Sequence, residues 1–189
     1  MTKLLGISGS LRRGSHNSAL LRAATRLMPP EATLEVASIR GIPLYDYDVE
    51  VQGLPAAVTQ LKEAIVGADG VLLVTPEYNN GIPGVFKNAI DWLSRPETDI
   101  ARVFGGRPFA VIGTSPGRFG TVLSQTAWLP VLRVLGTRAW FGGRVAVPRA
   151  RAVFDESGAL KDAEVGELLR QFLAGYVAFV RGGGARPAG

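Results

Sequence analysis

Small polar residues, glycine and arginine are concentrated in residues 9–17, which read Gly-Ser-Leu-Arg-Arg-Gly-Ser-His-Asn. Serine and asparagine side chains donate hydrogen bonds, and Arg12 adds a positive charge. An apolar run at 3–8 precedes this first loop, and helical spacing of apolar residues begins after Ser18. The loop therefore leads into a helix N-terminus, whose free N–H groups favour an anion, most simply a phosphate. A serine-rich turn in which Asn17 only caps the helix stays an alternative.

The first loop differs from the two commonest nucleotide-binding motifs. It has no lysine followed by serine or threonine, as a P-loop requires, and the spacing of Gly6, Gly9 and Gly14 does not fit the dinucleotide fingerprint. These differences favour a mononucleotide over ATP or a dinucleotide.

Two further loops carry residues suited to a ligand. The second loop, residues 76–81, reads Pro-Glu-Tyr-Asn-Asn-Gly, and the third, residues 114–120, reads Thr-Ser-Pro-Gly-Arg-Phe-Gly. Tyr78 offers an aromatic face, and Gly81 allows a planar ligand to approach the backbone. A flat heteroaromatic ring with a phosphate tail fits these loops together.

Alternating apolar runs and helical patterns position these loops. We predict strands at 3–8, 34–38, 70–75, 109–113 and 139–147, with a bulge or an irregular segment at Gly142 and Gly143, and helices at 18–28, 56–66, 83–93, 121–135 and 163–181. Residues 39–55 are too rich in turn formers for a helix. The pattern predicts an α/β fold: a doubly wound, five-stranded parallel sheet with helices on both faces and 70–75 in the centre. The three loops then meet at the carboxyl ends of the strands.

Length and composition narrow the class of protein. A chain of 189 residues fits one domain, which we expect over residues 1–181, followed by a disordered tail at 182–189. The absence of cysteine excludes disulfides and thiolate chemistry. We expect no signal peptide, because a polar turn begins at Gly9, and a cytoplasmic location fits this and the lack of cysteine. We also expect no membrane helix, because no apolar run approaches the roughly 20 residues that span a bilayer.

The charged residues do not indicate nucleic-acid or metal binding. The net charge of +5 comes from arginines scattered along the chain, and no nucleic-acid-binding motif accompanies them. Asp46 and Asp48 have no nearby carboxylates that would complete a cation cage, so we interpret them as turn residues.

The three loops together resemble the NADPH-dependent FMN reductase family, the flavodoxin-like group that includes bacterial quinone, azo-dye and chromate reductases. The resemblance rests on residues 9–17, on 76–92 (Pro-Glu-Tyr-Asn-Asn-Gly-Ile-Pro-Gly-Val-Phe-Lys-Asn-Ala-Ile-Asp-Trp) and on 113–120, and it covers about residues 3–180. It implies a flavodoxin-like fold and noncovalently bound FMN.

The resemblance also implies which residues bind the cofactor. The first loop would hold the phosphate through Ser10, Arg12, Ser15, Asn17 and Ser18, with Leu11 in the same loop. The second and third loops would hold the flavin ring through Pro76, Glu77, Tyr78, Asn79 and Gly81, mainly by main-chain contacts, and through Ser115, Gly117 and Gly120 on its pyrimidine side. We assign no chemistry to His16.

The implied reaction is a ping-pong transfer, in which NAD(P)H delivers hydride to flavin N5 and an acceptor then takes the electrons. Hydride transfer needs no general base, so we expect no catalytic side chain. Quinones, flavins, azo or nitro compounds and chromate are all candidate acceptors. The sequence leaves NADPH and NADH open, with Arg118 a candidate for contacting the 2′-phosphate. An electron carrier of the flavodoxin type and a regulatory flavin-binding protein are the alternatives.

The family commonly forms homodimers or homotetramers. By position, Trp92 and Leu93 are candidates for an interface that completes the flavin pocket, and Asp91 for a structural or subunit-contact role. A place in the core is an equally good interpretation of the large aromatic residues Phe86, Trp92, Trp128 and Trp140.

Overall fold

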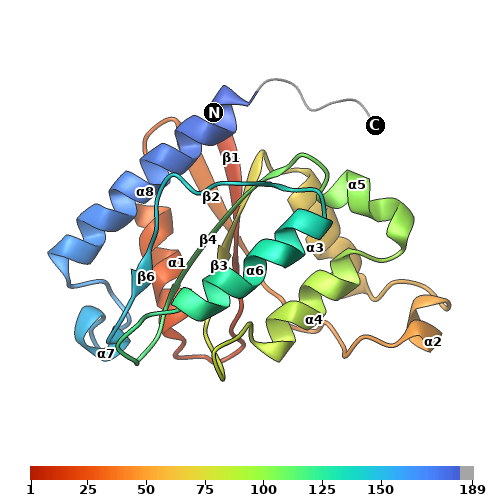
Figure 1. Ribbon diagram of the computed structural model, residues 1–189, viewed down its shortest axis with the longest axis horizontal. Helices are drawn as coiled ribbons and strands as arrows, with labels where there is room; N and C mark the ends of the chain where they lie inside the picture. Colours follow the sequence, from red (N-terminus) through yellow and green to blue (C-terminus); the bar gives the residue numbers. More distant parts are fainter. Residues whose placement is uncertain (184–189) are drawn as a thin grey trace.

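A parallel sheet forms the centre of this computed structural model, which describes residues 1–183 (Figure 1). Its strands lie in the order β2 (Ala32–Ala37), β1 (Thr2–Ser8), β3 (Gly70–Val74), β4 (Pro108–Thr114) and β5 (Arg138–Ala139), and β6 (Ala146–Val147) also pairs with β4. Every pairing is parallel. The strand predicted to be central is β3, and this is confirmed.

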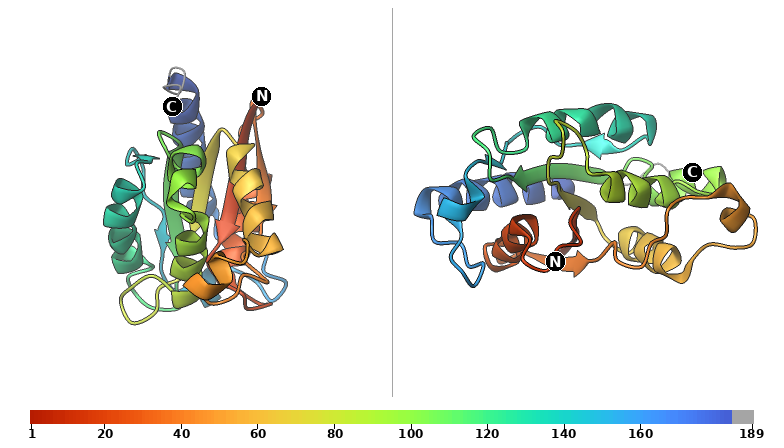
Figure 2. Two further views of the ribbon diagram at one scale, coloured as in Figure 1. Left: turned by 90° about the vertical axis from the view of Figure 1, so that its right-hand side faces the viewer. Right: turned by 90° about the horizontal axis from the view of Figure 1, so that it is seen from below.

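Helices cover both faces of the sheet, as Figure 2 shows. The helices α1 (His16–Arg26) and α8 (Ala163–Gly182) pack on one face, and α3 (Ala56–Val66), α4 (Gly84–Leu93) and α6 (Val122–Val134) pack on the other. Short helices complete the chain: α2 (Tyr47–Glu50), η1 (Glu97–Asp99), α5 (Ile100–Val103) and α7 (Ala150–Val153). The predicted doubly wound α/β fold is therefore confirmed.

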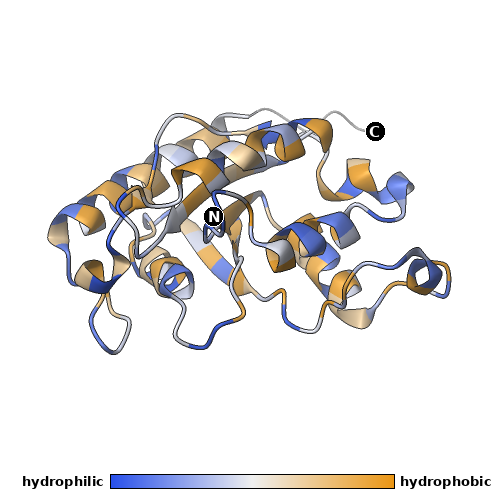
Figure 3. Ribbon diagram, turned by 60° about the horizontal axis from the view of Figure 1, so that its bottom comes forward, coloured by the Kyte–Doolittle hydropathy of each residue, from blue (hydrophilic) through white to orange (hydrophobic). Residues whose placement is uncertain are grey.

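Two apolar cores separate across the sheet because side chains alternate along each strand. In β3, Leu72 and Val74 face the core beneath α1 and α8, whereas Val71 and Leu73 face the core beneath α3, α4 and α6. All four side chains are fully buried, as expected for a strand covered on both faces. Hydrophobic and hydrophilic residues alternate along the covering helices, which accordingly bury one face each (Figure 3).

The predicted fifth strand at 139–147 is two short strands, and the irregular segment expected as one alternative at Gly142 and Gly143 lies between them. Only β5 and β6 pair with the edge of β4, and the chain leaves the sheet between them. Trp140 is the physical reason. Its ring packs against Phe172 and Tyr176 of α8, with ring centroids 4.7 and 5.6 Å away, and a Cβ at Gly142 would lie only 2.7 Å from its Nε1. The glycines therefore accommodate a tryptophan rather than a simple bulge.

The prediction that 39–55 contains no helix is also wrong, because α2 lies within it. Asp46 caps this short helix by accepting a hydrogen bond from the Asp48 N–H at 2.9 Å. At the other end of the chain, α8 continues one residue beyond the predicted end, to Gly182. Most of the expected tail, 184–189, lies outside the described residues.

None of the helices in residues 1–183 combines the length and apolar character that a membrane span needs.

Candidate functional site

The three loops singled out in the sequence meet at the carboxyl edge of the sheet, which lies at the bottom of Figure 1 and faces the viewer in the right-hand view of Figure 2. A cavity of about 160 Å³ opens between them. It is lined by Ser10, Arg12, Ser15, His16, Asn17, Pro76, Glu77, Tyr78, Thr114, Ser115 and Pro116. Residues more than a hundred positions apart thus surround one space.

The first loop presents backbone donors at the start of α1. Ser15 is the N-cap, and its hydroxyl accepts a hydrogen bond from the Ser18 N–H at 3.2 Å. The N–H groups of His16 and Asn17 have no acceptor among the residues that the structure describes. Ser18 is half-buried, and its hydroxyl lies 3.0 Å from that of Ser8 rather than in the cavity. The free donors of the loop are thus mainly backbone groups.

Asn17 fastens the first loop to the third. Its Nδ2 donates to the Thr114 carbonyl at 2.8 Å, and its Oδ1 accepts from the Thr114 N–H at 2.9 Å. Asn17 is buried and is not the helix cap that the alternative interpretation required, because Ser15 has that role. Its paired contacts fix the distance between two walls of the cavity.

Positive charge collects beside the first loop. Arg12 is exposed, and its guanidinium has no carboxylate partner in the described part of the chain. His16 stacks on Phe154 with centroids 5.9 Å apart. Partial burial lowers the pKa of His16, and the charges of Arg12 and Arg151 lower it further, so the imidazole is neutral at pH 7. The free positive charge at this wall therefore comes from arginine.

The second loop is a tight turn with an exposed aromatic ring. Tyr78 and Gly81 exchange backbone hydrogen bonds of 3.2 and 2.9 Å, and Asn79 and Asn80 have φ values of +49° and +61°, typical of a type I′ turn. The Tyr78 side chain is 63% exposed. Glu77 points elsewhere: its carboxylate accepts from the Ser124 N–H at 2.9 Å, in the first turn of α6.

A buried polar network supports the second loop, and the sequence analysis did not find it. The Thr75 hydroxyl donates to the Pro76 carbonyl at 2.8 Å, lies 2.9 Å from the Ser124 hydroxyl and accepts from the Trp128 Nε1 at 3.1 Å. Nothing in the spacing of Thr75 along the chain indicates these partners. The network joins the end of β3 to α6 and so fixes where the turn begins.

A hydrogen bond within the third loop joins its beginning to its end. The Ser115 hydroxyl donates to the Gly120 carbonyl at 2.6 Å. Gly120 has a φ of +65°, and a Cβ there would lie 2.6 Å from the backbone of Ala146, so only glycine fits. Arg118 and Phe119 lie at the exposed tip.

Backbone hydrogen bonds from the segment around α7 support the third loop. The sequence analysis did not identify this segment either. The Arg149 N–H donates to the Gly117 carbonyl at 2.9 Å, and the Ala150 N–H donates to the Ser115 carbonyl at 3.0 Å. A helix of four residues is too short to produce a periodic signal. These contacts bring Arg151 to the same wall of the site.

A second cavity, of about 370 Å³, adjoins the first and shares Ser10, Arg12 and Tyr78 with it. Its other lining residues are Gly9, Leu11, Pro83, Gly84 and Val85. A Cβ placed on Gly84 would meet nothing within 4 Å. A narrow cavity beside helix-terminal donors, continuous with a wider and less polar one, fits a phosphate joined to a planar ring.

The structure corrects the interface expected at Trp92 and Leu93, because both side chains are completely buried within the chain. The Trp92 Nε1 donates to the Pro43 carbonyl at 2.9 Å, and Asn88 donates to the same carbonyl at 2.8 Å. These residues hold the loop after β2. Asp91 pairs with Lys87 at 2.7 Å, one turn away on α4, as a structural role predicts.

Comparison with known proteins agrees with this geometry. The family model described as NADPH-dependent FMN reductase matches residues 2–152. The chain is 45% identical over 179 residues to an NAD(P)H-dependent FMN reductase of Pseudomonas aeruginosa, covering 95% of both chains. It is 36% identical over 179 residues to a 2-hydroxy-1,4-benzoquinone reductase of a Burkholderia species, covering 95% of this chain and 96% of the relative.

A solved structure has the same fold. The flavoenzyme NAD(P)H:(acceptor) oxidoreductase FerB from Paracoccus denitrificans superposes with a TM-score of 0.86 at 31% identity, covering 96% of this chain and 98% of that one. These relatives are named as reductases rather than as electron carriers. The chain therefore belongs to the NADPH-dependent FMN reductase family and is a flavin-dependent oxidoreductase.

Proposed function

We propose that this protein holds FMN in the two adjoining cavities and transfers electrons from NAD(P)H to a small quinone. The observation that carries the proposal is the convergence of all three loops on one space at the carboxyl edge of the sheet. This is the edge at which doubly wound folds bind their ligands.

The phosphate of FMN fits the narrower cavity. The N–H groups of His16 and Asn17 point along the axis of α1, where the helix dipole favours negative charge. Ser10 lines both cavities, and Arg12 adds a charge-assisted hydrogen bond. In our proposal Ser15 and Ser18, which we also expected to bind the phosphate, mainly support the loop: the Ser15 hydroxyl accepts from the Ser18 N–H, and the Ser18 hydroxyl lies beside that of Ser8.

The flavin ring lies against the second loop, which lines both cavities, and reaches the third loop where the two cavities adjoin. The turn from Tyr78 to Gly81 and the closed loop from Ser115 to Gly120 are both held by internal hydrogen bonds. Their geometry is therefore set before a ligand arrives, which reduces the entropy lost on binding. In our proposal Pro76, Glu77 and Asn79 contribute main-chain groups, and Gly117 allows close approach.

The protein has to position the reactants rather than perform acid–base chemistry. The chemistry that FMN would supply here is acceptance of a hydride from the reduced pyridine nucleotide and transfer of two electrons to a quinone, with protons from water completing the hydroquinone. No side chain needs to act as a base. The exposed Tyr78 lines both cavities. In our proposal the donor and the acceptor use this side of the site in turn, which gives ping-pong kinetics.

A quinone is the acceptor that we propose. The 2-hydroxy-1,4-benzoquinone reductase of Burkholderia supports a planar quinone as the acceptor, and the FMN reductase of Pseudomonas makes free FMN its rival. Steady-state oxidation of NADPH with 2-hydroxy-1,4-benzoquinone and with free FMN as rival acceptors tests this choice. A kcat/KM that is higher for free FMN than for the quinone would contradict it.

A visible spectrum of the purified protein, followed by anaerobic addition of NADPH, tests the function itself. We expect a flavin spectrum that bleaches within seconds of NADPH addition. A protein that neither retains nor binds FMN would refute the proposal. Tight FMN binding without turnover would instead support the regulatory alternative.

We also propose a homo-oligomer of single-domain subunits, each formed by residues 1–181, in the cytoplasm. Support comes from large apolar side chains that stay exposed in one chain: Val85, Leu123, Leu129, Val134 and Phe141. Leu129 and Phe141 line a single groove of about 260 Å³ beside α6. Sedimentation of the wild type and of Leu129→Glu tests this contact, and a wild-type protein that sediments as a monomer would rule it out.

A further inference from the structure

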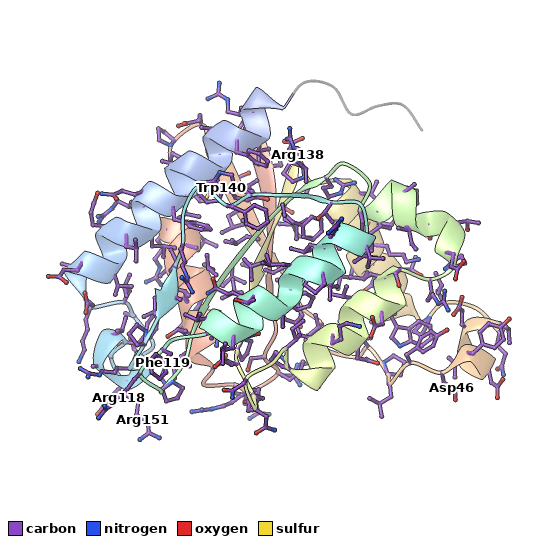
Figure 4. All side chains as sticks on the ribbon, viewed as in Figure 1. Asp46, Arg118, Phe119, Arg138, Trp140 and Arg151 are labelled. Carbon is purple, nitrogen blue, oxygen red and sulfur yellow. The ribbon has the colours of Figure 1, made fainter. Side chains whose placement is uncertain are left out.

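An exposed corner beside the proposed flavin site carries two arginines and an aromatic ring. Arg118 and Phe119 form the tip of the third loop, and Arg151 projects from α7 (Figure 4). The hydrogen bonds from Arg149 to Gly117 and from Ala150 to Ser115 join these two segments. The corner is therefore a continuous surface made from two parts of the chain.

Neither arginine of this corner is neutralised within the protein. Both are exposed, and neither has an ion pair or hydrogen bond to another side chain in the residues that the structure describes. The nearest carboxylate in the sequence, that of Asp155, is used within its own turn, where it accepts hydrogen bonds from Ser157 and from the Ala159 N–H. The corner thus presents uncompensated positive charge.

The backbone on both sides of Phe119 is held in place. Its side chain is 80% exposed, while the ends of the tip are fixed by the Gly120 conformation and by the contacts of Ser115 and Gly117. An exposed ring next to guanidinium groups can stack on a flat heterocycle while the arginines bind an attached anion.

We propose that Arg118, Phe119 and Arg151 bind the adenosine 2′-phosphate end of NADPH and make this protein select NADPH over NADH. The two donors differ only in that phosphate, and arginine is the side chain that accommodates it. The inference rests on the proposed function, because the donor has to reach the flavin from this side. The third loop lies between the two places, since it contributes Ser115 to the cavity and Arg118 to the corner.

The arginines and the phenylalanine have different expected signatures. Arg118→Ala and Arg151→Ala should each raise the KM for NADPH about tenfold, equivalent to one lost charge-assisted contact, and change the KM for NADH less than twofold. Phe119→Ala should raise the KM for both donors by a similar factor, because both contain adenine. Arg133→Ala is the matched control, since Arg133 is also exposed but lies in the last turn of α6.

Direct binding gives a readout that is independent of turnover. Calorimetry with adenosine 2′,5′-bisphosphate and adenosine 5′-phosphate should show tighter binding of the bisphosphate to the wild type and to Arg133→Ala. This preference should disappear in Arg118→Ala. Equal loss of NADPH and NADH affinity in the arginine variants, or no preference for the bisphosphate in the wild type, would overturn the inference.

The same experiments separate this inference from the proposed function. A wild type that binds FMN and oxidises NADH, with arginine variants that show no selective loss of NADPH, refutes the donor site alone. A wild-type protein that binds no FMN refutes the proposed function, whether or not it binds adenosine 2′,5′-bisphosphate. A third outcome is that Phe119→Ala raises the KM for the quinone and leaves the KM for both donors unchanged. That result would place the ring in the acceptor site and not in the donor site.

Discussion

The two edges of the sheet use cationic side chains in opposite ways. At the amino edge, Arg107 is 1% exposed and donates to the carbonyls of Val103 and Ala68 at 2.8 and 2.5 Å. Lys62 is equally buried and pairs with Asp99 at 2.8 Å. At the carboxyl edge, Arg12 and Arg118 are exposed and lack any such partner in the described chain.

This contrast indicates which cations maintain the fold and which are left free to bind an anion. Burying a cation is costly unless protein acceptors satisfy it, so the amino-edge groups stabilise only the arrangement that pairs them. An exposed cation without a partner adds little to stability and is free to bind an anion. Arginines of the two edges should therefore respond differently to substitution.

The largest effect should follow loss of the buried arginine. Arg107→Met leaves carbonyls at the amino edge without their donor, and we expect the free energy of unfolding to fall by about 3 kcal/mol. Urea denaturation measures this loss. Arg133→Met, an exposed control, should change stability by less than about 0.5 kcal/mol. An equally small loss of unfolding free energy in Arg107→Met would contradict the contrast between the two edges of the sheet.

Arg12 should show the opposite pattern. Arg12→Ala removes a charge-assisted phosphate contact, so FMN should bind about 1.5–3 kcal/mol more weakly, roughly 10- to 150-fold. The stability of the FMN-free protein should hardly change, because the side chain has no partner there. Fluorescence titration of FMN and urea denaturation of the apoprotein measure the two quantities. Unchanged FMN affinity would mean that the loop has another ligand.

Asn17 should combine both effects, because it belongs to the scaffold of the carboxyl edge. Asn17→Ala removes two buried hydrogen bonds to Thr114, and we expect a loss of about 1–2 kcal/mol in stability. FMN affinity should fall as well, since the first and third loops are no longer fastened together. Hydrogen exchange at Thr114 would report the loosening. A variant that loses FMN affinity at full stability would show that Asn17 contacts the ligand directly.

The smallest expected effect concerns the ion pair of Lys62 and Asp99. The hydrogen bond from Lys62 lowers the pKa of Asp99 below its ordinary value of 3.8, and the charges of Lys62 and Arg102 act in the same direction. The contribution to stability is therefore complete above the unfolded pKa and is lost as the pH falls through the lower folded pKa. We expect Asp99→Asn to cost about 1 kcal/mol at pH 7, because the carboxylate is partly exposed.

Urea denaturation at pH 7 and at pH 3 tests this last prediction. The wild type should lose stability between these values, and Asp99→Asn should lose less, because the group that titrates is gone. Lys87→Met, which removes an exposed pair on α4, is the matched control and should behave like the wild type. An equal loss in wild type and Asp99→Asn would contradict the linkage.

Much of the fold followed from local pattern. The limits of α3, predicted at 56–66, agree with the structure, and β3 is central as its continuous apolar run indicated. The family was also evident from the three loop motifs. The predictions failed where a distant side chain decides the backbone: Trp140 interrupts the edge strand because it packs on α8, and no local propensity reports that contact.

The three loops show the same division between what local sequence predicts and what distant contacts decide. Their residue types and their places after strands could be read from the sequence, because turn formers and helix caps act over a few positions. How the three loops are arranged relative to one another could not be read from the sequence. Asn17 joins a residue 97 positions away, Thr75 joins Trp128 across 53, and α7 reaches the third loop from a segment with no periodic signal.

Residue types and their spacing were enough to predict the class of fold, the family and the three loops at the carboxyl edge of the sheet. The packing of the elements, in contrast, places Trp92 in the core rather than at an interface, makes Asn17 the link between two loops, and brings Arg118 and Arg151 to one corner. Spacing encodes which face of an element is apolar, whereas the partner of a polar side chain depends on which elements pack together.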